Sequence, residues 1–312
     1  MKQIVLFAVV VFAVGTQAFG ESEMKVIVDD CCVKVQSGEA RLLSYRYGDV
    51  PFKPYADKLL SPSGVNILRD APHDHLHHHA LMLAFNVDGK NYWEEHKNAG
   101  TQRHLAIETL TEKGAAGFTE RIDWVDTKKD VVALEETRKL LLRSVDEPKA
   151  TLLTWESALS LPKGKDQAVI EGGHYHGLGM RFIESMDKDG VFFNADGADG
   201  KVVRGDEKLT PSRWCAYTAE AEGHRVTVAM FDHPSNPRPV LWFTMHTPFA
   251  YLSATMNYWK EPLTLKGEAP MVLRYGVALL DGKVAPEEVE SLYKRWLSSL
   301  GERPTRSIPA RY

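Results

Sequence analysis

The chain has 312 residues, a formal net charge of −4 and a composition ordinary for a globular protein. A mildly acidic chain without a basic tract gives no support for nucleic-acid binding, and three cysteines do not make a disulfide framework. The length suits one large β domain or two smaller ones.

Residues 1–18 have the pattern of a secretory signal peptide, with cleavage expected between residues 18 and 20. Lys2 gives a positive start, residues 4–14 form an apolar run, and residues 16–18 resemble a cleavage site. The run is short for a membrane span, although an uncleaved anchor is the alternative. No later segment is apolar enough to cross a bilayer. We therefore expect a secreted or periplasmic protein without membrane integration after signal cleavage.

Most of the chain after residue 24 has strand-like patterns, separated by turns rich in Gly, Asp, Asn and Pro. The run at 131–143 is ambiguous, because its LEETRKLLLR segment also suits a helix. The expected strands are residues 25–28, 33–36, 118–125, 131–143, 151–161, 225–231, 240–246 and 271–280.

One helix is expected at residues 285–300, with Pro286 in its first turn and two carboxylates at its positive dipole end. Val289, Leu292, Trp296 and Leu300 form an apolar stripe that should dock on a sheet. Many strands and few helices indicate a mainly β protein: a large antiparallel β-sandwich of the supersandwich type with one C-terminal amphipathic helix. We expect a single domain over residues 21–302 and a tail at 303–312.

Five of the twelve histidines occur within seven residues, a density that packing alone seldom explains. An extended backbone would place alternate histidines on one face, whereas a ligand-binding loop fits the pattern equally well. Three interpretations stay open: a metal site, an acid–base site in which Asp74 orients an imidazole, and a hydrogen-bonded strand end. The histidines are His73, His75, His77, His78 and His79.

A second segment, residues 171–181, has glycines on both sides of His174 and His176, which point the same way on a strand. Arg181 follows at a spacing that can face the same pocket, and its guanidinium suits carboxylate or sugar oxygens. The His-x-His pair resembles a metal-binding cupin pattern only faintly, because Glu184 lies too far along the chain. An edge strand with hydrogen-bonded histidines is the alternative.

A third segment, residues 231–246, places polar side chains on a stiff turn between two expected strands, which is one way to build a binding edge. In the alternative, Asp232 and Asn236 only cap the turn. Aromatic side chains near it can stack on a sugar face, although most tryptophans belong to cores. The binding candidates are Asp232, Asn236, Arg238, Trp242 and His246, and the further aromatic candidates are Trp214, Tyr258 and Trp259.

The cysteines leave two alternatives open: Cys215 pairs with Cys31 or Cys32, or all three are small buried apolar residues. Motifs of metalloproteases, serine hydrolases and nucleotide-binding enzymes are absent from the sequence.

Taken together, these segments resemble the PmoA-like secreted bacterial family over roughly residues 40 to 282. Leu76 replaces the usual proline of that family, and His79-Ala80 stand where it has Arg-Gly. The matching stretches are Asp74–His78 to D-H-P-H-H, Asp88–Trp93 to G-x-x-x-W, Gly177–Arg181 to G-L-x-x-R, and Ser212–Trp214 with Asp232–Arg238 to W…D-H-P-x-N-x-R.

The resemblance implies a β-supersandwich of the galactose-mutarotase type, a fold common among carbohydrate epimerases, lyases and hydrolase domains. Such sites use His with Glu or Asp on a concave sheet face. The methane oxygenase in the family's name is not implied, since a membrane-embedded oxygenase subunit needs spanning helices.

We therefore predict an exported carbohydrate-active protein that performs acid–base chemistry of the epimerase, lyase or hydrolase type on a sugar. The alternatives are a non-catalytic periplasmic glycan-binding protein and a metal-dependent enzyme whose divalent ion is held by some of His75, His77, His78, His174 and His176. The predicted catalytic residues are His75, His78, Asp74, His174 and His176. The predicted substrate-binding residues are His77, Arg181, Asp232, Asn236, Arg238, Trp242 and His246.

Overall fold

The structure is a computed structural model that describes residues 23–301. The expected signal peptide and the expected tail at 303–312 lie outside the described residues. Within 23–301, no helix combines the length and apolar character that a membrane crossing requires.

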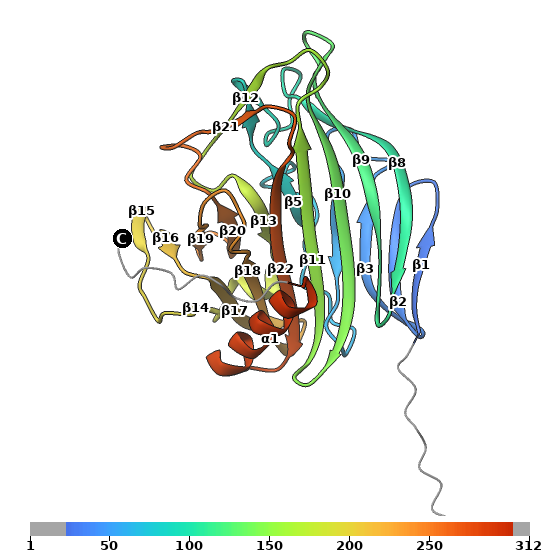
Figure 1. The fold of residues 1–312 in the computed structure, drawn as a ribbon. Helices are drawn as coiled ribbons and strands as arrows, with labels where there is room; N and C mark the ends of the chain where they lie inside the picture. Colours follow the sequence, from blue (N-terminus) through green and yellow to red (C-terminus); the bar gives the residue numbers. More distant parts are fainter. Residues whose placement is uncertain (1–22, 302–312) are drawn as a thin grey trace, which may run out of the picture.

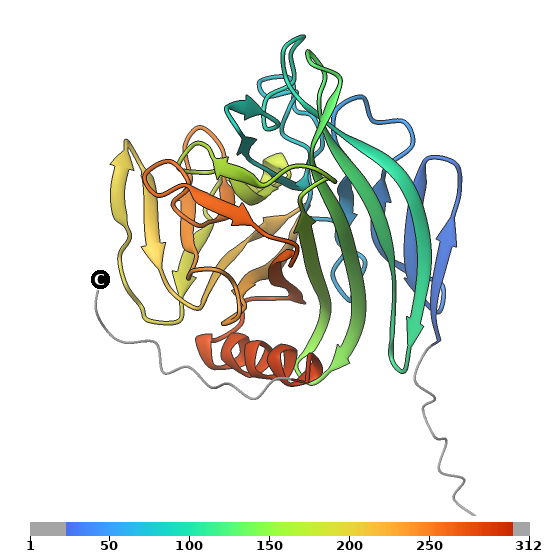
Figure 2. The same cartoon turned by 45° about the horizontal axis from the view of Figure 1, so that its top comes forward.

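Two large antiparallel sheets pack face to face, and a small third sheet lies at one end (Figures 1 and 2). In spatial order, the ten-stranded sheet contains β1 (Met24–Val28), β2 (Cys32–Ser37), β3 (Ala40–Arg46), β4 (Tyr55–Leu59), β5 (Leu81–Ala84), β13 (Gly177–Arg181), β20 (Tyr251–Thr255), β19 (Leu241–Met245), β16 (Glu207–Pro211) and β15 (Lys201–Arg204). The eight-stranded sheet contains β14 (Val191–Asn194), β17 (Trp214–Ala221), β18 (His224–Asp232), β22 (Met271–Asp281), β11 (Lys149–Ser160), β10 (Val131–Asp146), β9 (Ala115–Asp126) and β8 (Thr101–Glu112). The small sheet contains β21 (Leu263–Lys266), β12 (Gln167–Glu171), β6 (Asn86–Val87) and β7 (Lys90–Asn91), and a short 3-10 helix spans Glu184–Asp187. The predicted antiparallel β-sandwich is thus confirmed.

The ambiguous run at 131–143 forms β10, paired with β9 on one side and β11 on the other. Its burial alternates with a period of two: Glu136, Arg138 and Leu140 are buried, while Glu135 and Thr137 are exposed. Helix propensity is a weak preference, and pairing with two long neighbouring strands overrides it here.

The predicted C-terminal helix is confirmed as α1 (Pro286–Ser299), which lies across the outer face of the eight-stranded sheet (Figure 1). Its buried stripe, which includes Val289, Leu292 and Trp296, packs on β11, β18 and β22. The Trp296 indole is fully buried and donates a hydrogen bond to Thr154 Oγ1 at 3.0 Å. The stripe therefore covers the apolar sheet face that would otherwise meet water.

A charged cluster is embedded in the apolar core between the two large sheets. Arg138 has no exposed surface, and its guanidinium forms two hydrogen bonds with the buried Glu136 carboxylate, at 2.8 and 2.9 Å. It also donates to Tyr45 Oη at 2.8 Å and to Gln102 Oε1 at 2.9 Å, while the Tyr45 hydroxyl donates to the buried Glu120. This cluster ties β3, β8, β9 and β10 together across the core.

The register of the ten-stranded sheet decides which side chains face away from that core. Met180 pairs with Leu81 and Leu252, and this row points inward with Tyr45 toward the other sheet. The alternate row, which includes Arg181 and Tyr251, points to the opposite face. The candidate site is built on that outer face.

The three cysteines are free thiols, so the expected alternative of a disulfide with Cys215 is not formed. Cys215 is buried on β17, as the apolar interpretation expected, and Cys32 is also buried. Cys31 corrects that interpretation, because it is half-exposed in the turn between β1 and β2.

Candidate functional site

The histidine-rich segment forms a loop of two successive turns, so the extended alternative is wrong and the loop alternative holds. The amide of His75 donates to Pro72 O, and the amide of His78 donates to His75 O, both at 2.9 Å. Ala71 and Ala80, at the two ends of the loop, have positive φ angles of 41° and 44°, a conformation that costs energy for a residue other than glycine. Because of these turns, several of the histidines cluster together instead of alternating between two faces of a strand.

Three histidines gather on the pocket side of this loop. The ring centroids of His75 and His78 are 4.6 Å apart, those of His77 and His78 are 4.6 Å apart, and those of His75 and His77 are 5.8 Å apart. His73 is exposed, and His79 points to a different, buried environment. The loop thus separates the five histidines into distinct roles.

These three histidines line a pocket of about 500 Å³, a size within the range of small-molecule sites. The other walls come from the segment after β7 and from β16, β19 and β20, so residues distant in sequence meet there. The remaining lining residues are Trp93, Glu94, Tyr175, Arg204, Gly205, Asp206, Glu207, Phe243, Met245, Thr247, Pro248, Phe249 and Tyr251.

The second predicted segment reaches the same region. His174 Nε2 lies 2.8 Å from Glu207 Oε2, and Arg204 donates to the other oxygen of Glu207. The His176 ring stacks on Trp93 with centroids 4.7 Å apart, and the edge contact between this indole and His78 has a centroid distance of 6.2 Å. The structure therefore brings the two histidine segments close together, but only Tyr175 of the second segment lines the pocket. His174 and His176 lie in the turn between β12 and β13, which corrects the expected strand.

Three histidine–carboxylate pairs border this pocket. His75 Nδ1 lies 3.1 Å from Asp74 Oδ2 without forming a hydrogen bond, so the orienting role expected of Asp74 stays a prediction. His77 Nδ1 lies 3.3 Å from Glu94 Oε2, and His174 with Glu207 forms the third pair. A carboxylate beside an imidazole fixes its tautomer and orientation.

Burial lowers the pKa of three of these histidines. It lowers the pKa of His78 to about 2, and it lowers the pKa of His176 to about 3. Both rings are therefore neutral at physiological pH. Burial also lowers the pKa of His77, although the neighbouring Glu94 acts in the opposite direction.

Several buried donors beneath the pocket find no hydrogen-bond partner among residues 23–301. They include Arg181 Nε and Nη1, Tyr251 Oη and Trp93 Nε1. The guanidinium of Arg181 lies under Phe249, 3.3 Å from the ring centroid, and its Nη2 is 3.5 Å from Asp74 Oδ2. Buried donors normally have acceptors, so this group is suited to ligand oxygens.

Gly179 makes room for this floor. A Cβ atom there would lie 2.0 Å from Tyr251 Oη and 3.2 Å from the Trp93 ring, so any larger residue would displace them. The second glycine of the Gly-Leu-Gly-Met-Arg stretch is thus explained by the close approach of two aromatic side chains.

His79 belongs to a buried polar network beside the site. Its Nδ1 lies 2.7 Å from Asp70 Oδ1 and its Nε2 lies 2.9 Å from Glu95 Oε1, while Lys53 Nζ lies 2.6 Å from the same Glu95 oxygen. Burial acts to lower the pKa of His79, but the two carboxylates outweigh it and raise the pKa above 6.5.

Because the pKa of His79 is raised in the folded state, its contribution to stability is complete below pH 6.5 and is lost as the pH rises through the raised value. We expect the excess unfolding free energy of the wild type over His79→Gln to be largest at acidic pH and to shrink toward alkaline pH. Urea unfolding across this range measures it. His73→Gln, an exposed control, should show no such trend, and a difference that grows with pH would refute the assignment.

The turn of the third predicted segment, residues 232–239, is not part of the pocket. Asp232 is buried at the end of β18, where it accepts hydrogen bonds from Asn236 Nδ2 at 2.7 Å and from the Val240 amide at 3.2 Å. Burial raises the pKa of Asp232 to about 7. Arg238 donates to the backbone oxygens of Met256 and Glu261. The expected binding edge is corrected to its alternative, a turn held by its own polar groups.

Trp242 and His246 are corrected for a different reason. On β19, Phe243 and Met245 face the pocket, so their neighbours Trp242 and His246 face the core. Trp242 is fully buried and donates to Ser212 O at 2.7 Å, and His246 packs on Phe192 with centroids 4.7 Å apart. Of the further aromatic candidates, Trp214 and Tyr258 are buried, whereas Trp259 is 41% exposed and its ring lies 5.7 Å from His174.

The five predicted metal candidates do not converge as a ligand set. Within residues 23–301, only one group of at least three His, Cys, Asp or Glu residues has ligand atoms within 4.8 Å of one another, and it consists of Asp29, Cys31 and Cys32. His174 is engaged by Glu207, and His176 stacks on Trp93. The geometry thus favours the acid–base interpretation of the pocket over the metal interpretation.

Sequence reasoning did not select several residues that line the pocket. Glu94 directly follows the Trp93 of the G-x-x-x-W resemblance, and Tyr175 lies between the two selected histidines, so both had a local signal. Glu207, Phe249 and Tyr251 had none, since only the folded sheet brings their strands and loop to the histidines.

A protein-family model described as a family of unknown function, DUF6807, matches residues 32–294. No curated protein matches the sequence.

Three solved structures resemble the fold at low sequence identity. A candidate mutarotase (YeaD) from Salmonella typhimurium is 11% identical with a TM-score of 0.41, and the match covers 83% of this chain and 97% of that one. The GH36 alpha-galactosidase AgaA from Geobacillus stearothermophilus is 11% identical with a TM-score of 0.48, covering 83% of this chain but only 41% of the galactosidase. The Slr1438 protein from Synechocystis sp. PCC 6803 is 8% identical with a TM-score of 0.39, covering 83% and 96%.

Proposed function

The chain belongs to the DUF6807 family of unknown function, and from its own pocket we propose that it is an exported carbohydrate-active protein that transfers protons on a bound sugar. Membership of the PmoA-like family stays a prediction, because the match to DUF6807 does not test it. The observation that carries the proposal is one pocket whose lining combines three histidines and two glutamates with aromatic rings, and one of these glutamates, Glu207, is bonded to His174 outside the lining.

The lining suits both faces of a sugar. The rings of Tyr175, Phe243 and Phe249 offer apolar surface to the C–H face of a pyranose. Glu94 and Glu207 accept hydrogen bonds from hydroxyl groups, and the Tyr251 hydroxyl, which lines the pocket without a partner among residues 23–301, supplies a hydrogen bond to a sugar oxygen. Such a mixture of apolar walls and few convergent polar groups is typical of small-molecule sites.

Two pairs, His77 with Glu94 and His75 with Asp74, are more exposed than His174 with Glu207 and are placed for proton transfer. His77 is neutral near pH 7 because its pKa is lowered, so it can accept a proton, and Glu94 holds its ring. The ring centroid of His75, which lies beside Asp74, is 5.8 Å from that of His77. His75 can therefore serve the opposite proton transfer on a sugar atom between the two rings. The neutral His78 binds substrate oxygens. The reaction class is epimerisation, elimination or hydrolysis.

The second candidate function is non-catalytic glycan binding in the periplasm. It shares the aromatic walls and the buried donors, but it requires no proton transfer. It predicts saturable sugar binding without product, and unchanged affinity when His77 is replaced.

Sugar binding is tested by calorimetry of the full chain against a panel of neutral and acidic monosaccharides and disaccharides. We expect one class of sugar to bind, and Tyr175→Ala to weaken its affinity at least about tenfold, because the Tyr175 ring packs on Trp93 and Phe243 at the pocket wall. Tyr47→Ala, whose ring packs on His104 at another sheet edge, is the control. Binding that both variants retain would place the sugar elsewhere.

Turnover separates the two candidate functions. Proton NMR of the bound class of sugar should show accelerated anomeric exchange or a new product in the presence of the wild type. Saturable binding without either change would support the glycan-binding alternative.

A further inference from the structure

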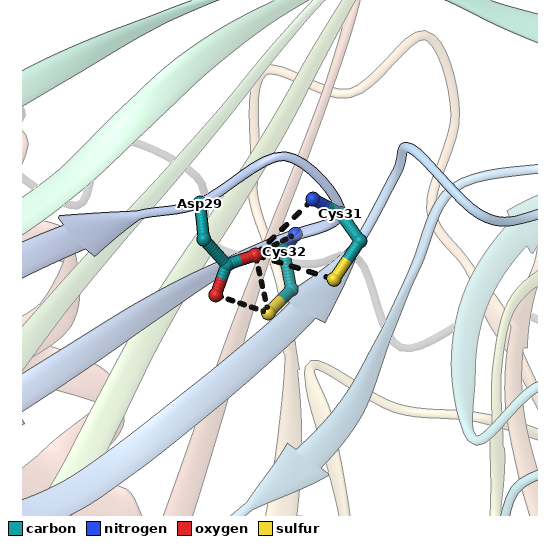
Figure 3. A group of neighbouring side chains, drawn as sticks. All are labelled: Asp29, Cys31 and Cys32. Atoms are coloured by element: carbon teal, nitrogen blue, oxygen red, sulfur yellow. Dashed lines mark hydrogen bonds between the residues drawn. The ribbon is translucent and has the colours of Figure 1, made fainter.

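A second cluster of reactive side chains lies far from the histidine pocket, in the turn between β1 and β2. Asp29 Oδ1 is 3.2 Å from Cys31 Sγ and 3.1 Å from Cys32 Sγ, and Asp29 Oδ2 is 3.2 Å from Cys32 Sγ (Figure 3). Two thiols and one carboxylate thus point toward one another in this turn, which joins the edge strand β1 to β2 in the ten-stranded sheet.

The turn is held in this form by groups that surround it. The amides of Cys31 and Cys32 both donate to Asp29 Oδ1, at 3.1 and 2.8 Å, which fixes the carboxylate between the two sulfurs. The amides of Tyr47 and Gly48 both donate to Cys31 O. A Cβ on Gly48 would lie 2.1 Å from Asp30 O, so this close approach of two chain segments needs the glycine.

The spacing of the three ligand atoms is close to that around a metal ion. A tetrahedral zinc ion with Zn–S bonds of about 2.3 Å and a Zn–O bond of about 2.0 Å separates sulfur from oxygen by about 3.5 Å. The observed separations of 3.1 and 3.2 Å therefore need only a few tenths of an ångström of adjustment. The half-exposed Cys31 leaves the fourth position open to water.

The charges also fit a dication. Two thiolates and one carboxylate around a divalent ion leave a net charge of −1, and Lys34 Nζ lies 2.9 Å from Asp29 Oδ2 to offset it. Thiolate ligands select soft or borderline ions over Mg²⁺ and Ca²⁺. We propose that Asp29, Cys31 and Cys32 form a binding site for Zn²⁺ that clamps the turn between the first two strands.

Zinc binding at this site must release the thiol protons to solvent. The affinity for zinc should therefore rise with pH. This dependence distinguishes thiolate ligation from a site made of carboxylates alone.

The test uses the full chain without a histidine tag, reduced and stripped of metal with a chelator. Zinc titration should give about one ion per chain with proton release, and Co²⁺ in its place should give the near-ultraviolet absorption of a sulfur–cobalt bond. Cys31→Ser should weaken zinc binding at least about tenfold and remove most of this absorption. It replaces a half-exposed residue, so it is the variant safest for folding.

The controls separate this site from other sources of zinc. Asp30→Asn, Cys215→Ser and His77→Ala should each leave the stoichiometry and the cobalt spectrum unchanged. An absence of zinc binding by the reduced wild type would overturn the proposal. So would zinc binding that survives Cys31→Ser, or that is lost in His77→Ala, since the ion would then lie elsewhere.

Discussion

Replacing Arg138 with methionine is expected to lower the free energy of unfolding by about 3–5 kcal/mol. The substitution removes hydrogen bonds to Glu136, Tyr45 and Gln102. It leaves the Glu136 carboxylate buried without a cation, whereas Glu120 keeps His104 Nδ1 at 2.8 Å. A buried charge left without its partner lowers the free energy of unfolding far more than the loss of an exposed ion pair does. The melting temperature should fall by about 10 °C or more, measured by calorimetry or by circular dichroism.

The matched control is Arg103→Met on β8, the edge strand of the same sheet. Arg103 lies 2.9 Å from Asp123, but 54% of its side chain is exposed, so its removal should cost about 1 kcal/mol or less. A loss below about 1 kcal/mol for Arg138→Met would mean that the Glu136 carboxylate takes up a proton at little cost, and that the cluster does not hold the sheets together.

Replacing His77 with alanine is expected to lower the turnover of the sugar substrate by about 10²–10⁴-fold, which is the usual contribution of a general base. In the wild type, kcat/KM should fall on the acid side, because only the neutral His77 ring accepts a proton and burial lowers the pKa of this imidazole below the usual 6.5. Steady-state rates from pH 4.5 to 8 measure both effects in one assay.

His73→Ala is the control for this variant, since His73 lies in the same loop but is exposed and outside the pocket lining. It should keep wild-type rates and the wild-type pH profile. Turnover by His77→Ala within about threefold of the wild type, with a native circular dichroism spectrum, would remove His77 from the proton transfer.

The sequence predicted the strands whose patterns are long or strongly apolar. The runs at 118–125, 151–161, 225–231 and 271–280 correspond to β9, β11, β18 and β22. The helix at 285–300 was found within one residue at each end because Pro286 and its apolar stripe mark it. Short strands such as β5 and β13 were missed, since a few buried residues in a sheet centre carry no readable period.

Some of the site residues were predicted from the sequence and others were not, and the physical reason differs between segments. The histidine loop and His174 attract attention by residue type, and the fold does bring them together. Asp232, Asn236 and Arg238 have equally polar side chains, but local turn bonds engage them, and a sequence pattern does not separate turn capping from ligand binding. The outward direction of Phe243 and the inward direction of Trp242 depend on strand register, which one sequence leaves undetermined.

The histidine loop is closed at its base by the bridge between Asp70 and His79, and it stands on strands that would keep their pairing without it. Its length and composition can therefore vary among related chains while the scaffold stays intact. Such an arrangement lets the polar side chains at the mouth of the pocket change without altering the strands beneath them.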